Sequence, residues 1–314
     1  MSEFLPDVLA VVGPTATGKT DVGILLAEAL GGEIISADCM AVYQGMDIGT
    51  AKPSPEQRQR VPFHAIDVCR PDEPFSVARF QQLALEAIRQ IRQRGAVPLV
   101  VGGTGLYVKA LLDGFQIPPT AADEALRHSL WQEARRLGSR ALYTRLQEVD
   151  PFAASRIHPH DAVRIIRALE VYQVTGRPIS EWQRRQPPPE VGRCRRFGLT
   201  MSRELLYQRI NERVERMIAQ GWLEEVRRLL EAGYDPHLPA MRSLGYGELV
   251  QVAQGKMELS EAVALIQRET RRFAKRQLTW FRADKQIEWV DASQGAERTA
   301  RQILERLRSE KRDI

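Results

Sequence analysis

Eight residues near the N-terminus have the types and spacing of a phosphate-binding loop. They are Gly13, Pro14, Thr15, Ala16, Thr17, Gly18, Lys19 and Thr20. They follow the apolar run Val8–Val12 and precede a helix-like segment, 21–30. In a Gly-x-x-x-x-Gly-Lys-Thr loop the backbone N–H groups surround phosphate oxygens at a helix N-terminus, and the lysine adds a positive charge. The threonine hydroxyl can ligate Mg²⁺. The loop therefore predicts that the chain binds a polyphosphate.

Two further polar residues follow apolar runs that the sequence predicts to be strands. Asp38 comes after the run 33–36, and Thr104 lies in a Gly-Gly-Thr-Gly turn after the run 98–101. A carboxylate at a strand end can act as a general base, and a hydroxyl can orient a reacting group. The alternatives are an Asp that caps a turn and glycines that serve packing alone. The run 98–101 is not followed by the acidic residue of hydrolytic ATPases; Asp67 is the other candidate for that magnesium role.

Strand-like and helix-like patterns alternate over the first third of the chain. The apolar runs 8–12, 33–36, 64–68 and 98–101 are short, and the segment 77–94 has helical periodicity. This alternation predicts an α/β fold, with a P-loop NTPase-like parallel sheet flanked by helices. Ligands of such sheets bind at the carboxyl ends of the strands, where Asp38 and Thr104 are expected.

The pattern changes between two groups of prolines, 118–119 and 187–189. Only helical segments lie between them, at 124–137, 139–148 and 161–175. Because proline ends helices and cannot donate to a sheet, these groups predict an inserted all-helical domain, 119–189, within a core made of 1–118 and 190–314. The remaining elements are expected as a strand at 197–201, helices at 204–232, 245–253 and 260–278, a strand at 287–290 and an exposed charged helix at 298–312.

The charge of the chain is unevenly distributed. Residues 1–118 carry 10 Lys and Arg against 13 Asp and Glu, whereas 119–314 carry 35 against 27. This excess of positive charge favours a polyanionic partner larger than a nucleotide, although a solvated basic surface is the alternative. The first apolar run is too short to span a bilayer and follows no basic leader, and the three cysteines form no metal or disulfide pattern. A cytoplasmic, monomeric protein without a membrane partner is expected.

With these motifs the chain resembles the tRNA dimethylallyltransferases, the bacterial tRNA isopentenyltransferase family, over nearly its whole length. Besides the phosphate loop, the resemblance rests on residues 34–43, 45–53, 101–107, 164–171, 175–176, 245–246 and 274–282. Residues 45–53 and the Lys-Arg-Gln-Leu-Thr-Trp-Phe-Arg run that begins at Lys275 are the most specific of these motifs.

The resemblance implies transfer of a prenyl group from dimethylallyl diphosphate to N6 of the adenine just 3′ of the tRNA anticodon. The loop Gly13–Thr20 would hold the diphosphate, with Mg²⁺ on Thr20. Asp38 would accept the proton of the adenine amine, and Thr104 would position the reacting groups. The partner would be the anticodon stem-loop of tRNA.

The resemblance also implies a set of tRNA-binding residues. They are Asp38, Cys39, Met40, Ala41, Thr104, Arg127, Val163, Arg164, Ile165, Ile166, Arg167, Arg242, Ser243, Leu244, Gly245, Tyr246 and Gly247. Cys39, Ala41, Val163 and Gly247 depart from the family pattern, where Ser, Gln, Gln and a basic residue are usual. For the arginines, ordinary surface charge is the alternative.

The predicted helix 260–278 carries a basic stripe, which we define as Arg268, Arg271, Arg272, Lys275 and Arg276. Trp280 and Phe281 follow it. Basic and aromatic residues together suit an RNA backbone and unstacked bases, while core packing is the alternative for the two aromatic residues. Arg209 and Arg213 can reach a diphosphate or pair with nearby glutamates. Two other functions stay open at this point: a P-loop small-molecule kinase and an ATP-dependent RNA-binding switch.

Overall fold

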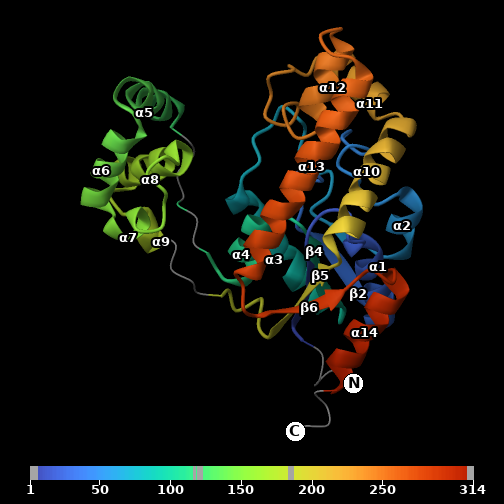
Figure 1. Ribbon diagram of the computed structural model, residues 1–314. Helices are drawn as coiled ribbons and strands as arrows, with labels where there is room; N and C mark the ends of the chain where they lie inside the picture. The colour runs from blue at the N-terminus through green and yellow to red at the C-terminus, as the bar shows by residue number, and fades with distance from the viewer. Residues whose placement is uncertain (1–5, 116–117, 119–122, 183–186, 310–314) are drawn as a thin grey trace. The chain divides into compact units, whose positions relative to one another are not determined.

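The computed structural model describes residues 6–115, 118, 123–182 and 187–309. Six strands form one sheet in these residues, in the order β3-β2-β4-β1-β5-β6, with every neighbouring pair parallel. The strands are β1 (Val8–Val12), β2 (Gly32–Ser36), β3 (Phe63–His64), β4 (Val97–Gly102), β5 (Cys194–Thr200) and β6 (Ile287–Asp291). Helices flank the sheet (Figure 1), and the predicted α/β fold with a P-loop-type parallel sheet is confirmed.

Both faces of this sheet are buried. Every residue of β1 and β4 is buried, as expected for a parallel sheet that helices cover. Alternate strand residues, among them Leu9 and Leu99, share one core with α1 (Lys19–Leu30) and α14 (Ala296–Ser309). Helix α3 (Val77–Gln93) packs against β2 and β4. The short helices α2 (Pro55–Arg60) and α4 (Gly105–Leu112) follow β2 and β4 in the chain.

A second hydrophobic core lies among the later helices, α10 (Arg203–Ala219), α11 (Trp222–Glu231), α12 (Tyr246–Ala253) and α13 (Leu259–Arg282). The largest side chains in this core are Trp222 and Tyr246, whose rings meet edge to face at 5.6 Å. Met46 joins them from the segment after β2. This core therefore connects the helices to a segment that follows Asp38.

Three predicted elements are wrong in detail. The single helix 204–232 is two helices, because Gly221 has a left-handed φ of 96° and redirects Trp222 into the core. The strand 64–68 is only Phe63–His64, since Ala65 and Asp67 adopt φ values of 60° and 56° that a strand cannot contain. The C-terminal helix is not simply exposed: Thr299, Ala300, Ile303 and Leu307 are buried against the α1 side of the sheet core, and residues 310–312 lie outside the described residues.

The chain divides into two compact units, Met1–Leu111 with Pro189–Ile314, and Leu112–Pro188. The second unit contains α5 (Glu124–Leu137), α6 (Ser139–Val149), α7 (Pro151–Ala154), α8 (Ala162–Thr175) and α9 (Ile179–Trp182), with its own core of leucine, isoleucine and alanine side chains. The sequence predicted the corresponding boundaries of the inserted domain after residues 118 and 189. Part of the first proline group, Pro119, lies outside the described residues. No helix in the described ranges has both the length and the apolar character that crossing a bilayer requires.

Candidate active site

The ends of β2 and β4 bring Asp38 and Thr104 together. The Thr104 N–H donates a hydrogen bond to the Ala37 carbonyl at 3.1 Å. Gly102 permits this approach, since a Cβ at that position would lie 2.2 Å from the Ala37 oxygen. Thr104 Oγ1 then accepts a hydrogen bond from the Cys39 N–H at 3.0 Å. The threonine hydroxyl is thus held next to the residue that follows Asp38.

The two carboxylate oxygens of Asp38 have different surroundings. Oδ1 accepts hydrogen bonds from the N–H of Met40 at 2.8 Å and of Ala41 at 3.4 Å. Asp38 therefore does cap a turn, as the alternative proposed. Within the described ranges no group donates to Oδ2. The turn orients the carboxylate through one oxygen and leaves the other available to a ligand.

The phosphate loop has the backbone that its glycines allow. Gly18, at the N-terminus of α1, has a left-handed φ of 82°. Gly13 has a φ of 140°, and a Cβ there would lie 2.7 Å from the Leu199 carbonyl oxygen. The Pro14 carbonyl accepts hydrogen bonds from Thr17 Oγ1 at 2.9 Å and from Lys19 Nζ at 2.6 Å. The loop is therefore closed around its own lysine.

Two cationic side chains of this site, those of Lys19 and Arg213, have no ion-pair partner among the described residues. Burial, together with the like charge of Arg213, lowers the pKa of Lys19 from 10.5 to about 7, against the opposite effect of Asp38. Burial likewise lowers the pKa of Arg213, while Asp38 raises it. Arg209 differs, because it donates to the Ser293 carbonyl at 3.1 Å. Both side chains are half-buried, and cations without ion-pair partners are typical of an anion-binding site.

One cavity of about 520 Å³ collects most of the predicted residues. Its walls include Thr15, Gly18, Lys19, Thr20, Asp38, Cys39, Met40, Ala41, Thr104, Ser243, Leu244 and Tyr246, together with Arg213, Phe273, Arg276 and Gln277. A cavity of this volume suits a small organic substrate. The predicted residues Gly13, Pro14, Ala16, Thr17, Arg242, Gly245 and Gly247 do not line it.

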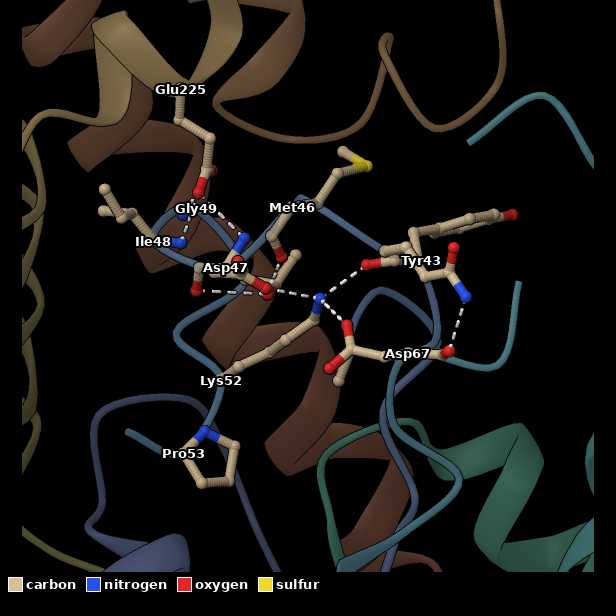
Figure 2. Close-up of polar contacts among 12 residues, drawn as sticks. Tyr43, Met46, Asp47, Ile48, Gly49, Lys52, Pro53, Asp67 and Glu225 are labelled. Atoms are coloured by element: carbon tan, nitrogen blue, oxygen red, sulfur yellow. Dashed lines mark hydrogen bonds and ion pairs between the residues drawn. The ribbon is translucent and has the colours of Figure 1, made fainter. Parts of the chain in front are cut away.

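A buried carboxylate, Glu225, fixes the segment 47–49 beside this cavity. It accepts hydrogen bonds from the N–H groups of Asp47 and Ile48 at 2.8 Å each and of Gly49 at 3.2 Å (Figure 2). The Tyr246 hydroxyl donates to the same carboxylate at 2.6 Å. Glu225 therefore joins the family segment 45–53 to the later family motif at Tyr246. Nothing in the local sequence around Glu225 indicates this role, because its partners lie far away in the chain.

Lys52 holds the same segment from within. Its side chain is 1% exposed, and Nζ donates to the Tyr43 carbonyl and to the carboxylates of Asp47 and Asp67 at 2.5 to 2.7 Å (Figure 2). Asp67 also pairs with Arg58 at 2.7 Å. Asp67 does not line the cavity of the phosphate loop, and its two ion pairs give it a structural role in this segment.

Gln277 of α13 is a site residue that the prediction did not include. Its side chain is 7% exposed; Oε1 accepts from the Thr15 N–H and Nε2 donates to the Gly103 carbonyl, both at 2.9 Å. It therefore bridges the phosphate loop and the turn that carries Thr104. The signal in the sequence is a polar residue where helical spacing from Ala274 and Phe281 requires a buried one.

The helical insert changes the interpretation of four predicted tRNA-binding residues. The side chains of Ile165 and Ile166 are 0% and 2% exposed and form the core of that unit, so their predicted contact with tRNA is corrected to packing. Arg127 and Arg167 both pair with Glu170, each at 2.9 Å, and the Glu170 side chain is 1% exposed. These two arginines stabilise the insert.

Two other predicted residues of the insert lie on its surface. Val163 is 65% exposed, which is unusual for valine. The Arg164 side chain is 64% exposed, and among the described residues its one ion-pair partner is Asp161, at 3.4 Å. In this segment these are the side chains that remain accessible to a partner.

The turn 241–247 is also divided between core and surface. Gly245 and Tyr246 are buried, and a Cβ at Gly245 would lie 2.0 Å from the Trp222 ring, so this glycine serves packing. Burial and the charge of Glu225 raise the pKa of Tyr246. Ser243 donates to the Ala240 carbonyl. Arg242 is exposed, and Gly247 contributes no side chain.

Burial also limits the predicted contacts next to Asp38. Ala41 is 4% exposed, so little of it is accessible even to a ligand in the cavity. Burial and the charge of Asp38 raise the pKa of Cys39 to about 11, which keeps its thiol neutral at pH 7. Cys39 and Met40 are half-buried.

The basic stripe of α13 is largely exposed. Arg268, Arg272, Lys275 and Arg276 lie on the surface, whereas Arg271 donates to the Asn211 side chain at 2.6 Å. Of the two aromatic residues that follow, Phe281 is 2% exposed and belongs to the interior, while Trp280 is 40% exposed. The helix thus presents positive charge and one indole ring to solvent.

The donor set at the phosphate loop fits a magnesium ion that is shared with a polyphosphate. Thr20 lines the cavity, and its hydroxyl bonds to no described residue. Within the described ranges, no group of three or more His, Cys, Asp or Glu residues could hold a metal on its own. Mg²⁺ suits this arrangement because it retains water and usually combines few protein oxygens with substrate phosphates.

Two protein-family models match the chain. The IPP transferase model matches residues 41–284, and the isopentenyl transferase model matches residues 6–63. The chain belongs to the IPP transferase family. The resemblance inferred from the motifs is therefore confirmed.

Relatives within the family match the chain over nearly all of its length. A tRNA dimethylallyltransferase from Desulforudis audaxviator is 51% identical over 301 residues, which are 95% of this chain and 97% of that protein. One from Pelotomaculum thermopropionicum is 50% identical over 283 residues, or 90% of each chain. The crystal structure of a tRNA isopentenylpyrophosphate transferase from Bacillus halodurans is 40% identical with a TM-score of 0.69, covering 97% and 98% of the two chains. A eukaryotic dimethylallyltransferase acting on tRNA is 27% identical with a TM-score of 0.75, covering 91% and 73%.

Proposed function

We propose that this protein is a tRNA dimethylallyltransferase. It transfers the dimethylallyl group of dimethylallyl diphosphate to N6 of the adenine that is 3′-adjacent to the anticodon, and it releases diphosphate. The observation that carries the proposal is the cavity that Asp38 shares with the phosphate loop, Lys19 and Arg213. Asp38 Oδ2 accepts no hydrogen bond there from any described residue. Membership of the IPP transferase family supports the same reaction.

The cationic side of the cavity serves the leaving group. An allylic diphosphate departs readily when its negative charge is neutralised, and Lys19, Arg213 and the loop N–H groups supply that neutralisation. Because burial lowers the pKa of Lys19 to about 7, a bound diphosphate would restore its proton. Mg²⁺ held by Thr20 would neutralise more of the negative charge on the same oxygens.

The acidic side serves the nucleophile. The N6 amine of adenine is a weak nucleophile, so the new N6–carbon bond forms as the carbon–oxygen bond to diphosphate breaks and as Asp38 Oδ2 takes one amine proton. Thr104 Oγ1, held by the Cys39 N–H, positions the amine for this step. Atoms and charge balance: prenylated tRNA, diphosphate and the carboxyl proton are the products.

The RNA would be bound by the exposed part of the predicted set. Exposed cations attract the phosphate backbone, and the candidates are Arg164, Arg242 and the basic stripe without Arg271. The target adenine must leave its stack to enter the cavity, which costs less in a loop than in a duplex. A monomeric state, a cytoplasmic location and contact of the insert with tRNA remain predictions.

The proposal is tested by incubating the protein, with Mg²⁺, with radiolabelled dimethylallyl diphosphate or ATP, with and without bulk tRNA. Label from the prenyl donor should appear in tRNA and should map to a prenylated adenosine after digestion. A matched tRNA transcript with guanine at the position 3′ of the anticodon should remain unlabelled. ATP turnover with a small acceptor would instead identify a kinase, and no turnover of either donor would favour an RNA-binding switch.

A further inference from the structure

The buried amide of Gln277 closes one end of the phosphate loop. Its Oε1 accepts from the Thr15 N–H and its Nε2 donates to the Gly103 carbonyl, so both polar atoms of the amide have partners at 2.9 Å. The side chain comes from α13, far away in the chain, and lies in the wall of the cavity. Its position there is fixed from two sides.

This contact shortens the part of the loop that can bind phosphate. Pro14 has no N–H, and the N–H of Thr15 is already used by Gln277. In the described ranges, the N–H groups of residues 16–20 donate to no acceptor outside α1. The free N–H groups therefore begin at Ala16 and continue toward the N-terminus of α1, where Lys19 lies.

We infer that Gln277 restricts the loop to a diphosphate and excludes a triphosphate. The inference rests on the proposed function, because it explains how a P-loop selects dimethylallyl diphosphate over the abundant nucleoside triphosphates. A third phosphoryl group would need the Thr15 N–H and the space that the Gln277 amide fills. Gln277 is thus a specificity-determining residue.

Gly103 supports the same arrangement from the opposite side. A Cβ at Gly103 would lie 2.4 Å from Gln277 Nε2, although the backbone there does not require glycine. A substitution at this position would displace the amide without removing it. Gly103→Ala therefore offers a second, independent way to open the closed end of the loop.

The experiment measures dissociation constants of inorganic pyrophosphate and inorganic tripolyphosphate by calorimetry, at constant free Mg²⁺. The wild-type protein should prefer pyrophosphate by about tenfold or more, since one hydrogen bond to a charged group is worth at least that factor. Gln277→Ala and Gly103→Ala should remove most of this preference, and ATP should become a competitive inhibitor of prenyl transfer.

Gln267→Ala is the matched control, because Gln267 lies on the same helix but bonds to Asn211 and Glu215 outside the cavity. It should retain the wild-type preference. Equal affinity of the wild-type protein for the two probes would overturn the inference whether or not any variant folds. An unchanged preference in folded Gln277→Ala would overturn it as well. The proposed function fails separately, if the wild-type protein does not prenylate tRNA.

Discussion

The phosphate-loop cavity and the helical insert use the same charged residue types in opposite ways. In the insert, Arg127 and Arg167 share the buried carboxylate of Glu170, which also accepts the Asp123 N–H at 3.0 Å. In the cavity, the charge of Arg213 adds to burial in lowering the pKa of Lys19, and within the described ranges neither side chain has an ion pair.

This difference separates charges that build the protein from charges that bind its ligand. A compensated buried charge stabilises its surroundings and has little left to offer to a partner. A charged side chain without such a partner destabilises the folded protein, and a ligand of opposite charge can offset this destabilisation. Spacing in the sequence does not separate these two groups of cationic residues, whereas the structure distinguishes them by their partners.

The largest expected effect is that of Asp38→Asn, the acidic counterpart of the two cations. Loss of the general base should lower the turnover number by about 10³-fold, within the range for such groups. Asparagine keeps the oxygen that accepts from Met40, so the turn and the affinity for tRNA should change little. Single-turnover transfer and filter binding measure the two quantities. Transfer at the wild-type rate would remove Asp38 from the base role.

Arg213→Met should affect activity and stability in opposite directions. Loss of one cation at the diphosphate should lower kcat/KM by about 10²-fold. The Tm should stay the same or rise, because a half-buried guanidinium near Lys19 is replaced by an apolar side chain of similar length. Arg209→Met is the control, since Arg209 lies one helical turn away and bonds to a carbonyl. A fall in Tm for the Arg213 variant would show that its charge is structural.

Glu170→Ala, in the insert, should lower stability and leave ligand binding unchanged, which is the reverse of the result expected for Arg213→Met. It removes the acceptor of two arginines and of one backbone N–H, which should lower the free energy of unfolding by about 2–3 kcal/mol. The measurement is a denaturant titration, with Glu181→Ala as control because its pair with Arg177 is exposed. Pyrophosphate binding, a property of the other unit, should be unchanged. A variant with wild-type stability would contradict the structural role of this cluster.

Local patterns in the sequence predicted most of the fold and two residues that line the cavity, Asp38 and Thr104. The helix at 77–94 and the strands around the loop follow from periodicity, and Asp38 and Thr104 follow from their positions at strand ends. These features depend on near neighbours in the chain, which is why spacing reveals them. The prediction of a single helix at 204–232 was wrong because its break depends on a distant contact. The chain turns at Gly221 so that Trp222 can reach a core formed by residues far away in the sequence.

The residues that hold the site together could not be predicted in this way. Glu225 bonds to a segment about 180 positions away and Gln277 to one about 260 positions away. Each is a polar residue in a helix, and only the packing of that helix shows what its side chain contacts. For the same reason the sequence could not show that Arg127 pairs with Glu170, which lies on another helix of the insert.

Lys19 makes pyrophosphate binding sensitive to pH. Because its pKa in the free protein is about 7, the lysine loses its proton between pH 6 and 9, and affinity should fall by about tenfold over that range. Calorimetry in buffers of different ionisation enthalpy should show proton uptake on binding near pH 8. Lys19→Met is the control, since it retains only the titration of pyrophosphate itself. Equal pH dependence in both proteins would contradict a titrating Lys19.

The same shift in pKa has a defined consequence for stability. The unfolded chain holds the lysine proton up to about pH 10.5, whereas the folded protein releases it near pH 7. Between these values the unfolded state binds more protons, so the contribution of Lys19 to the free energy of unfolding rises with pH. Saturating pyrophosphate should reduce this dependence, because it restores the proton to the folded state.

The smallest effect is expected at the surface, for the pair Arg272→Ala and Lys275→Ala in the basic stripe. Exposed cations bind phosphate by releasing counterions, so tRNA affinity should fall severalfold for every tRNA, and its dependence on salt should become shallower. Arg272 already pairs with Glu269 at 2.7 Å, which reduces its share of the effect. The control removes two exposed arginines of α14, Arg301 and Arg308, and should leave the salt slope unchanged. If the salt dependence of tRNA affinity were equal in both double variants, the basic stripe would belong to the solvated surface charges. Exposure alone does not distinguish one arginine from another; only a position that faces the RNA does.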